Sequence, residues 1–180
     1  MKADMPANES MVLIQPQAAY QQGYRAYVQA FLKAGERPPF RYELALRDFS
    51  AYLRRIQEDE LGIGIDPDSV PMSVYWLIDG SRSILGSSSF RHALNADLQD
   101  LGGNIGYKIH PHERRKGYGT LILKLTLQKA HEKGLTRVLV TCDADNIASA
   151  RIIQSNGGVF SSRSYSEKYQ REISRYWIEL

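Results

Sequence analysis

A chain of 180 residues with a net charge of +3 is long enough for one domain with a single hydrophobic core. The charge is too small to favour nucleic acid as a partner, since a basic stripe or a larger excess is expected there. No apolar run approaches the roughly 20 residues of a membrane helix, and a single cysteine, Cys142, excludes an internal disulfide framework. We therefore expect a cytoplasmic protein without membrane partners.

The first ten residues are polar and lack the apolar stretch of a secretory signal. We expect residues 1–10 to form a flexible tail and residues 11–180 to form one domain.

Alternating or β-branched segments, bounded by Gly and Pro, predict seven strands. In chain order these are residues 11–15, 72–78, 83–92, 105–110, 137–142, 159–163 and 174–180. In the second strand Val74, Trp76 and Ile78 should share one face.

Apolar residues at spacings of three and four predict four helices, over residues 17–34, 42–58, 120–133 and 147–156. Gly35, Gly134 and Gly157 are natural stops for three of them. The element order β-α-α-β-β-β-α-β-α-β-β predicts an α/β fold: a mixed sheet of about seven strands with helices on both faces.

The clearest chemical signal is the loop Arg114-Arg115-Lys116-Gly117-Tyr118-Gly119, which joins a strand to a helix. A helix N-terminus presents free N–H groups and a positive dipole, and glycines allow a ligand to approach the backbone closely. With the three cations, these features favour a pyrophosphate site. The alternative is a solvated helix start with turn glycines. Two other phosphate motifs, G-x-x-x-x-G-K-[ST] and G-x-G-x-x-G, are absent.

The wider segment closely resembles the GNAT superfamily of N-acetyltransferases. Arg114, Gly117 and Gly119 match the family pattern [QR]-x-x-G-x-[GA], and Asn146 to Ser149 followed by Gly157 resembles its N-x-x-[AS]…G signature. The match spans about residues 73–160. Residues 91–95, 103–107 and 175–178 resemble a bacterial group of predicted acetyltransferases without an assigned substrate.

This resemblance implies a GNAT-like fold in which two strands splay apart at a cleft for acetyl-CoA, the co-substrate. The pantetheine arm would pair with the backbone of Tyr107, Lys108 and Ile109, and the Ile109 N–H would donate to the developing oxyanion, a contribution of about 3 kcal/mol. The implied cofactor-binding residues are Tyr107, Lys108, Ile109, Arg114, Arg115, Lys116, Gly117, Tyr118, Gly119, Thr120, Asn146 and Ser149. Asn146 is also a good helix N-cap. No metal is implied.

The proton-transfer residues of many relatives are missing. Gly103, Asn104 and Ile105 stand where relatives place a basic Glu or His, and Thr141 stands where others have an acid. His92 is the leading candidate for the general base, followed by His110 and Glu113.

Many relatives supply a proton to the leaving thiolate from a tyrosine, but that position is Ile153 in this chain. Tyr165, Tyr169 or Tyr176 could substitute. An acyl relay through Cys142 is disfavoured, because it ends an apolar strand.

These features predict transfer of an acetyl group to a primary amine of a small molecule or peptide, by direct attack in a ternary complex, in a monomer or homodimer. The acceptor pocket should draw on residues 36–42, 86–92 and 161–171. Two alternatives stay open: a non-catalytic acyl-CoA-binding module of the same fold, and an RNA- or ribosome-associated protein supported by the basic loop alone.

Overall fold

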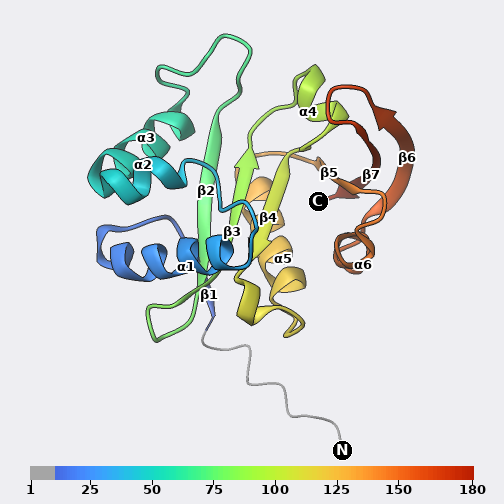
Figure 1. Cartoon of the computed structure of the whole chain (residues 1–180). Coiled ribbons are helices and arrows are strands. Elements are labelled where there is room, and N and C mark those ends of the chain that lie inside the picture. The colour runs from blue at the N-terminus through green and yellow to red at the C-terminus, as the bar shows by residue number, and fades with distance from the viewer. Residues whose placement is uncertain (1–10) are drawn as a thin grey trace, which may run out of the picture.

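The computed structural model describes residues 11–180, so the expected tail at residues 1–10 lies outside the described residues. Seven strands are present, as the sequence predicts (Figure 1). They are β1 (Val12–Ile14), β2 (Met72–Ile78), β3 (Ile84–Arg91), β4 (Ile105–Ile109), β5 (Arg137–Asp143), β6 (Val159–Ser166) and β7 (Arg171–Glu179).

Six α-helices and two short 3-10 turns connect the strands within these residues. They are η2 (Ala18–Tyr20), α1 (Gln21–Lys33), α2 (Tyr42–Arg47), α3 (Phe49–Leu61), α4 (Ala96–Asp100), η3 (Pro111–Glu113), α5 (Tyr118–Glu132) and α6 (Ile147–Ser155). None of the helices in residues 11–180 is long and apolar enough to cross a membrane.

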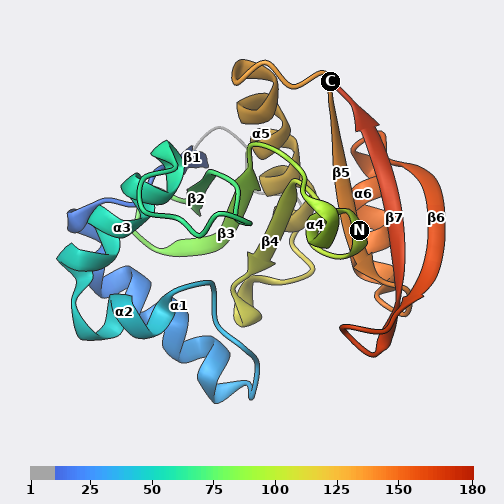
Figure 2. The same ribbon diagram turned by 90° about the horizontal axis from the view of Figure 1, so that it is seen from above.

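The strands form two antiparallel sheets, ordered β1-β2-β3-β4 and β5-β7-β6. The predicted single mixed sheet is thus divided where β4 and β5 would be neighbours. These strands meet only near their starts, where Asn104 N donates to Leu139 O at 2.7 Å, and they then diverge (Figure 2). The splay that the family resemblance implies is the reason for the division.

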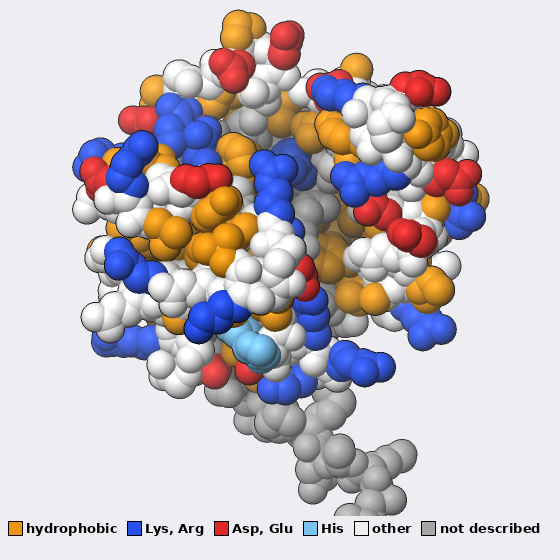
Figure 3. Space-filling view, in the orientation of Figure 1, with side chains coloured by type: hydrophobic (Ala, Val, Ile, Leu, Met, Phe, Trp, Pro, Cys, Tyr) orange, Lys and Arg blue, Asp and Glu red, His pale blue; other side chains and the backbone are white. Residues whose placement is uncertain are grey.

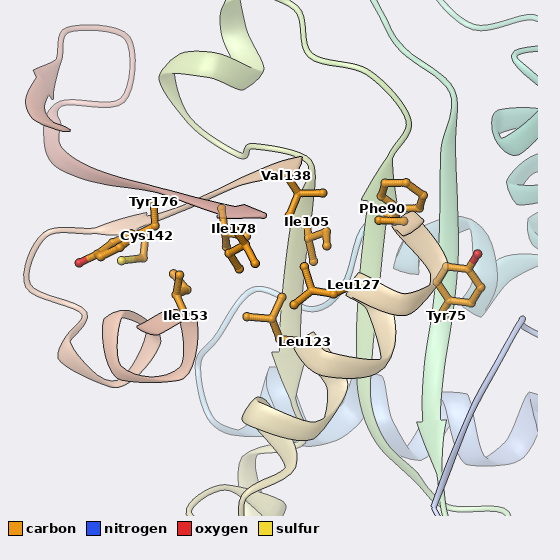
Figure 4. Close-up of a cluster of buried hydrophobic side chains, with 12 residues drawn as sticks. Tyr75, Phe90, Ile105, Leu123, Leu127, Val138, Cys142, Ile153, Tyr176 and Ile178 are labelled. Atoms are coloured by element: carbon orange, nitrogen blue, oxygen red, sulfur yellow. The ribbon is translucent and has the colours of Figure 1, made fainter. Parts of the chain in front are cut away.

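Helices cover both faces, as predicted. On one face of the first sheet, α1 and α3 bury an aromatic cluster in which the Tyr24 ring stacks on Trp76 at 4.9 Å. Trp76 and Ile78 belong to this cluster and Val74 packs against it, which confirms their shared face. On the other side, α5 and α6 close a core that spans both sheets (Figure 4).

Glycine is required at the junction of the sheets. Gly103 has a φ of +56°, and a Cβ there would lie 2.3 Å from Leu139 O. A larger residue would push β5 away from the start of β4, so the close approach of the sheets depends on this glycine.

Three features differ from the predicted elements. The predicted helix 42–58 is broken into α2 and α3 at Asp48, whose extended backbone lets its side chain accept a hydrogen bond from Ala51 N at 2.9 Å. The short helix α4, capped by Asn95, lies in a predicted loop. Strands β6 and β7 extend to a turn at residues 167–170. The sequence pattern missed the end of β6 because an exposed edge strand needs no apolar alternation.

Candidate active site

A cleft of about 660 Å³ opens where β4 diverges from the second sheet, and we call it the donor cleft. Its walls are the outer edge of β4, the loop that follows, the first turn of α5 and the first turns of α6. It is lined by Phe31, Glu36, Tyr107, Lys108, Ile109, Glu113, Arg114, Arg115, Gly117, Tyr118, Gly119, Thr120, Asn146, Ala148, Ser149, Arg151 and Ile152. All predicted cofactor-binding residues except Lys116 are therefore brought together.

The first turn of α5 forms one end of the donor cleft. Gly117 caps this helix with a φ of +85° and no side-chain acceptor, so the N–H groups of the first turn face the cleft without a cap. A Cβ on Gly119 would lie 2.6 Å from Ile152 Cδ1, and glycine therefore allows α6 to pack against the start of α5. The helix terminus and its positive dipole form a wall suited to an anion.

The three predicted cations differ in their contacts. Arg114 forms a bidentate ion pair with Glu36, at 2.7 and 2.5 Å, and this bond lowers the pKa of the Glu36 carboxyl. Lys116 pairs with Glu113 at 2.7 Å and lies outside the cleft lining. Arg115 forms no ion pair with any residue from 11 to 180. Arg114 is thus held by a carboxylate, whereas Arg115 and a further arginine of the cleft lining, Arg151, form no ion pair within the described residues.

The outer edge of β4 is open toward the donor cleft. His110 N donates to Leu85 O at 2.9 Å, so by antiparallel alternation the even-numbered residues bond to β3. The N–H groups of Tyr107 and Ile109 therefore point to the opposite edge, which no strand covers in the described chain. Ile109 O, on the same edge, lies 3.4 Å from Arg114 Nε. An extended ligand could pair with this edge as a further strand would.

The opposite wall is the start of α6. Asn146 Oδ1 accepts from Ser149 N at 3.0 Å, so Asn146 is an N-cap as well as a cleft residue. The Tyr107 hydroxyl reaches across to Ser149 Oγ at 3.4 Å, and burial raises the pKa of Tyr107 to about 12. This contact joins the two walls through a pair of hydroxyl groups.

A second cavity of about 790 Å³ lies beyond the start of β4. Figure 3 shows the molecule hollowed between its two halves, with basic side chains along the hollow. The cavity is lined by Phe40, Arg41, Asp59, Gly64, Ile65, Asp66, Pro67, Asp68, Ser69, Val70, Met72, Ser89, Arg91, Asn95, Asp97, Leu98, Leu101 and Tyr169. Each of the three segments predicted for the acceptor pocket contributes, but much of the lining comes from residues 64–70 and α4, which the sequence did not suggest.

Comparison with known proteins identifies the family. A family model described as "Acetyltransferase (GNAT) domain" matches residues 25–159. The chain belongs to the GNAT acetyltransferases. It is therefore an acyltransferase, as the sequence predicts.

Solved structures share the GNAT fold over nearly the whole chain. An acetyltransferase from Salmonella typhimurium that modifies the N-terminal serine of ribosomal protein L7/L12 is 14% identical, with a TM-score of 0.68 and 98% of each chain covered. The ribosomal-protein-S5-alanine acetyltransferase of Vibrio fischeri is 12% identical, with a TM-score of 0.71 and 97% and 95% covered.

The microcin C7 self-immunity acetyltransferase MccE, solved with acetyl-CoA and AMP, is 14% identical, with a TM-score of 0.68 and 96% and 94% covered. Curated protein sequences yield no match to the chain.

Ile153, the position at which the family resemblance implies a tyrosine, is part of the core in this chain. Ile153 is fully buried and lies with Cys142 and Tyr176 in Figure 4. Burial raises the pKa of the Cys142 thiol to about 11, which disfavours a thiolate relay. Of the substitute tyrosines, Tyr176 is buried in this core, Tyr165 is exposed and Tyr169 lines the second cavity.

The candidate bases lie in different surroundings. His92 lines neither cavity: its Nε2 lies 2.8 Å from Ser73 Oγ. His110 Nδ1 accepts from His112 N at 3.2 Å, and burial lowers its pKa. Glu113 lines the donor cleft but is paired with Lys116. The general base stays a prediction, and the structure does not bring His92 together with the cofactor residues.

Proposed function

We propose that this GNAT protein is an acetyl-CoA-dependent N-acetyltransferase that moves an acetyl group to a primary amine of a small molecule or peptide by direct attack in a ternary complex. The observation that carries the proposal is the donor cleft, which unites an open strand edge with a helix N-terminus and a free guanidinium. Acetyl-CoA is the co-substrate that the family and the acetyl-CoA-bound MccE structure support.

The cleft fits the three chemical parts of acetyl-CoA. The first turn of α5, at Tyr118, Gly119 and Thr120, would hold the pyrophosphate with its N–H groups. The outer edge of β4 would pair with the amide groups of the pantetheine arm, as in strand addition. When bound, acetyl-CoA supplies the acetyl thioester.

Ile109 is the residue proposed to act on the reacting carbonyl. Its N–H points into the cleft and is fixed by the strand, so it needs no reorganisation to donate a hydrogen bond. One such donor contributes about 3 kcal/mol when it faces a developing negative charge.

The second cavity is the proposed acceptor site. It lies on the other side of the start of β4: the Arg91 guanidinium is 3.7 Å from where a Cβ of Gly106 would lie, and the next residue, Tyr107, lines the donor cleft. An amine bound there would approach the thioester from the side opposite the pyrophosphate.

A matched pair of substitutions at Gly117 tests the donor cleft. Asp and Asn have nearly the same size and both tolerate a positive φ. Gly117→Asn therefore measures the effect of adding a side chain at this φ, and Gly117→Asp adds a negative charge at the proposed pyrophosphate site. By calorimetry we expect acetyl-CoA to bind Gly117→Asp at least about tenfold more weakly than Gly117→Asn. Equal affinities for the two variants would remove the pyrophosphate from this loop.

Turnover is tested separately. CoA release is measured with acetyl-CoA and a panel of primary amines, and amine-dependent release is expected. Tight binding of acetyl-CoA without release on any amine would favour the non-catalytic module instead.

A further inference from the structure

We infer that the second cavity selects acceptor amines that carry a carboxylate, and that the Arg91 guanidinium binds this carboxylate. The inference rests on the proposed function, because it names the substrate class of the same acceptor site.

Arg91 is held rigidly at the last position of β3. Its Nη1 donates to Gly102 O at 3.1 Å and to Gly103 O at 3.4 Å. The guanidinium lies over two glycines: a Cβ on Gly102 would be 3.7 Å from Arg91 Cζ, and a Cβ on Gly106 would be 3.7 Å from Nη1. The glycines therefore make room for the guanidinium, and the carbonyl groups fix its orientation.

The charge of Arg91 has no counterion among residues 11–180, although the side chain is largely buried. Burial lowers its pKa, with a small opposing influence from Tyr169 in the same cavity. Its Nη1 is used by the two carbonyl groups, while Nε and Nη2 donate to no acceptor in the described chain. These two N–H groups form the edge that binds both oxygens of a carboxylate in parallel.

The other cation in the cavity lining is already neutralised. Arg41 Nε pairs with Asp59 at 2.8 Å, and Asp59 also pairs with Arg55 at 2.6 Å. Arg91 is therefore the guanidinium that remains available to a ligand. A purely cationic acceptor would leave this guanidinium without a partner.

Two acidic residues also line the cavity, at the Arg91 end of the first sheet. Asp66 and Asp68 line the cavity and form no ion pair with residues 11–180. The cavity lining thus carries an unpaired guanidinium at the end of β3 and carboxylates in the loop before β2, a pattern that suits a molecule with charges of both signs.

The position of Arg91 limits the length of the acceptor. The guanidinium lies beside Gly106, and Ile109 is three residues farther along β4, or about 10 Å at the rise of a strand. The carboxylate and the amine should therefore be separated by several methylene groups, as in an ω-amino acid.

The test compares 6-aminohexanoate with hexylamine, which has the same chain but no carboxylate. Steady-state kcat/KM is measured for both amines with the wild-type protein, Arg91→Gln and Arg54→Gln, a control that removes an exposed arginine of α3 outside the cavity lining. The wild-type protein should prefer 6-aminohexanoate at least about tenfold, within the range for hydrogen bonds to charged groups. Arg91→Gln should reduce this ratio at least tenfold, mainly through KM, and Arg54→Gln should leave it unchanged.

A wild-type ratio near one would overturn the inference. So would an Arg91→Gln ratio equal to that of the wild type, because a purely structural role lowers both rates together. If Arg91→Gln does not fold, Arg91→Lys keeps the charge without the paired N–H groups and should still lower the ratio.

If no amine is acetylated, the proposed function fails and the carboxylate site is tested by binding. Calorimetry with 6-acetamidohexanoate, which is neutral at its amide end, should show binding to the wild-type protein and Arg54→Gln and at least tenfold weaker binding to Arg91→Gln. Absence of binding to the wild-type protein would overturn the inference. The affinity of the wild-type protein for acetyl-CoA, measured separately, tests the donor cleft independently of the carboxylate site.

Discussion

His92, the residue after β3, belongs to a chain of polar side chains that joins β2 to α3 and to the residue after α5. Its Nε2 contacts Ser73 Oγ at 2.8 Å, Ser73 donates to Glu60 at 2.9 Å, and Glu60 pairs with Lys133 at 3.0 Å. Burial, followed by the nearby charge of Lys133, lowers the pKa of His92. Folding therefore favours the neutral form of the His92 imidazole.

This shift predicts a pH-dependent contribution to stability. Because the pKa is lower in the folded state than its unfolded value of about 6.5, the contribution is present above that value and is lost as the pH falls through the folded pKa. In denaturant titrations, the free energy of unfolding of His92→Gln should fall less steeply than that of the wild type below pH 6.5. The shift at His110 is retained in both proteins, and parallel curves would contradict the expectation.

The same variant tests His92 as the general base. If His92 removes the proton from the amine, the ratio of mutant to wild-type kcat will change with pH. A ratio that stays flat across pH would show that His92 is not the general base, and the candidates would then be groups that line the cavities.

At the scale of elements, the break between α2 and α3 depends on one cap. Asp48 has an extended backbone, and its carboxylate accepts from Ala51 N. Asp48→Ala should lower the free energy of unfolding by about 1 kcal/mol, whereas Asp48→Asn should be nearly neutral, because Asn caps equally well. Equal losses in the two variants, measured by denaturant unfolding, would show that the cap is not the cause.

The loop after α1 is tied to the loop before α5 by the Glu36–Arg114 ion pair. A pyrophosphate in the donor cleft must compete with the Glu36 carboxylate for Arg114. Glu36→Gln should therefore bind acetyl-CoA about two- to fivefold more tightly, the size of an exposed ion pair. Glu179→Gln, at the exposed end of β7, is the charge-matched control. Weaker binding of acetyl-CoA by Glu36→Gln in calorimetry would contradict the expectation and show that Glu36 contributes to binding.

Elements with a strong local pattern could be predicted from the sequence, and those set by distant contacts could not. The alternation around Trp76 and the change from loop to helix at Gly117 are local patterns, and the structure contains both elements. The helix α4 is too short for periodicity, and β6 is a polar edge strand. Most of the donor cleft comes from one continuous segment of the chain, which a sequence motif can identify. The second cavity is assembled from loops far apart in the chain, so no sequence motif identifies residues such as Asp66 as part of it.

At the scale of the whole molecule, Asn104 connects the two sheets at a point where no pairing of strands joins them. Its Oδ1 accepts from Leu139 N at 2.8 Å and its Nδ2 donates to Arg91 O at 3.2 Å, while its backbone N donates to Leu139 O. Asn104 is 3% exposed, so these groups have no water to replace the amide. Asn104 is one of the three residues, with Gly103 and Ile105, at the place where the family resemblance implies a base.

Asn104→Ala should leave two buried backbone groups without partners and lower the free energy of unfolding by about 3 kcal/mol. Hydrogen exchange should show the Leu139 amide losing protection more than amides in the middle of β2. A uniform loss of protection across both sheets would contradict a local role at the junction.

The central claim is that the splay between the sheets holds acetyl-CoA. A crystal structure with acetyl-CoA tests it most directly. We expect the pantetheine arm to pair with the Tyr107 and Ile109 side of β4, and the pyrophosphate to lie within hydrogen-bonding distance of the N–H groups of residues 115–120. Acetyl-CoA bound elsewhere, or with its pyrophosphate away from the first turn of α5, would contradict the account.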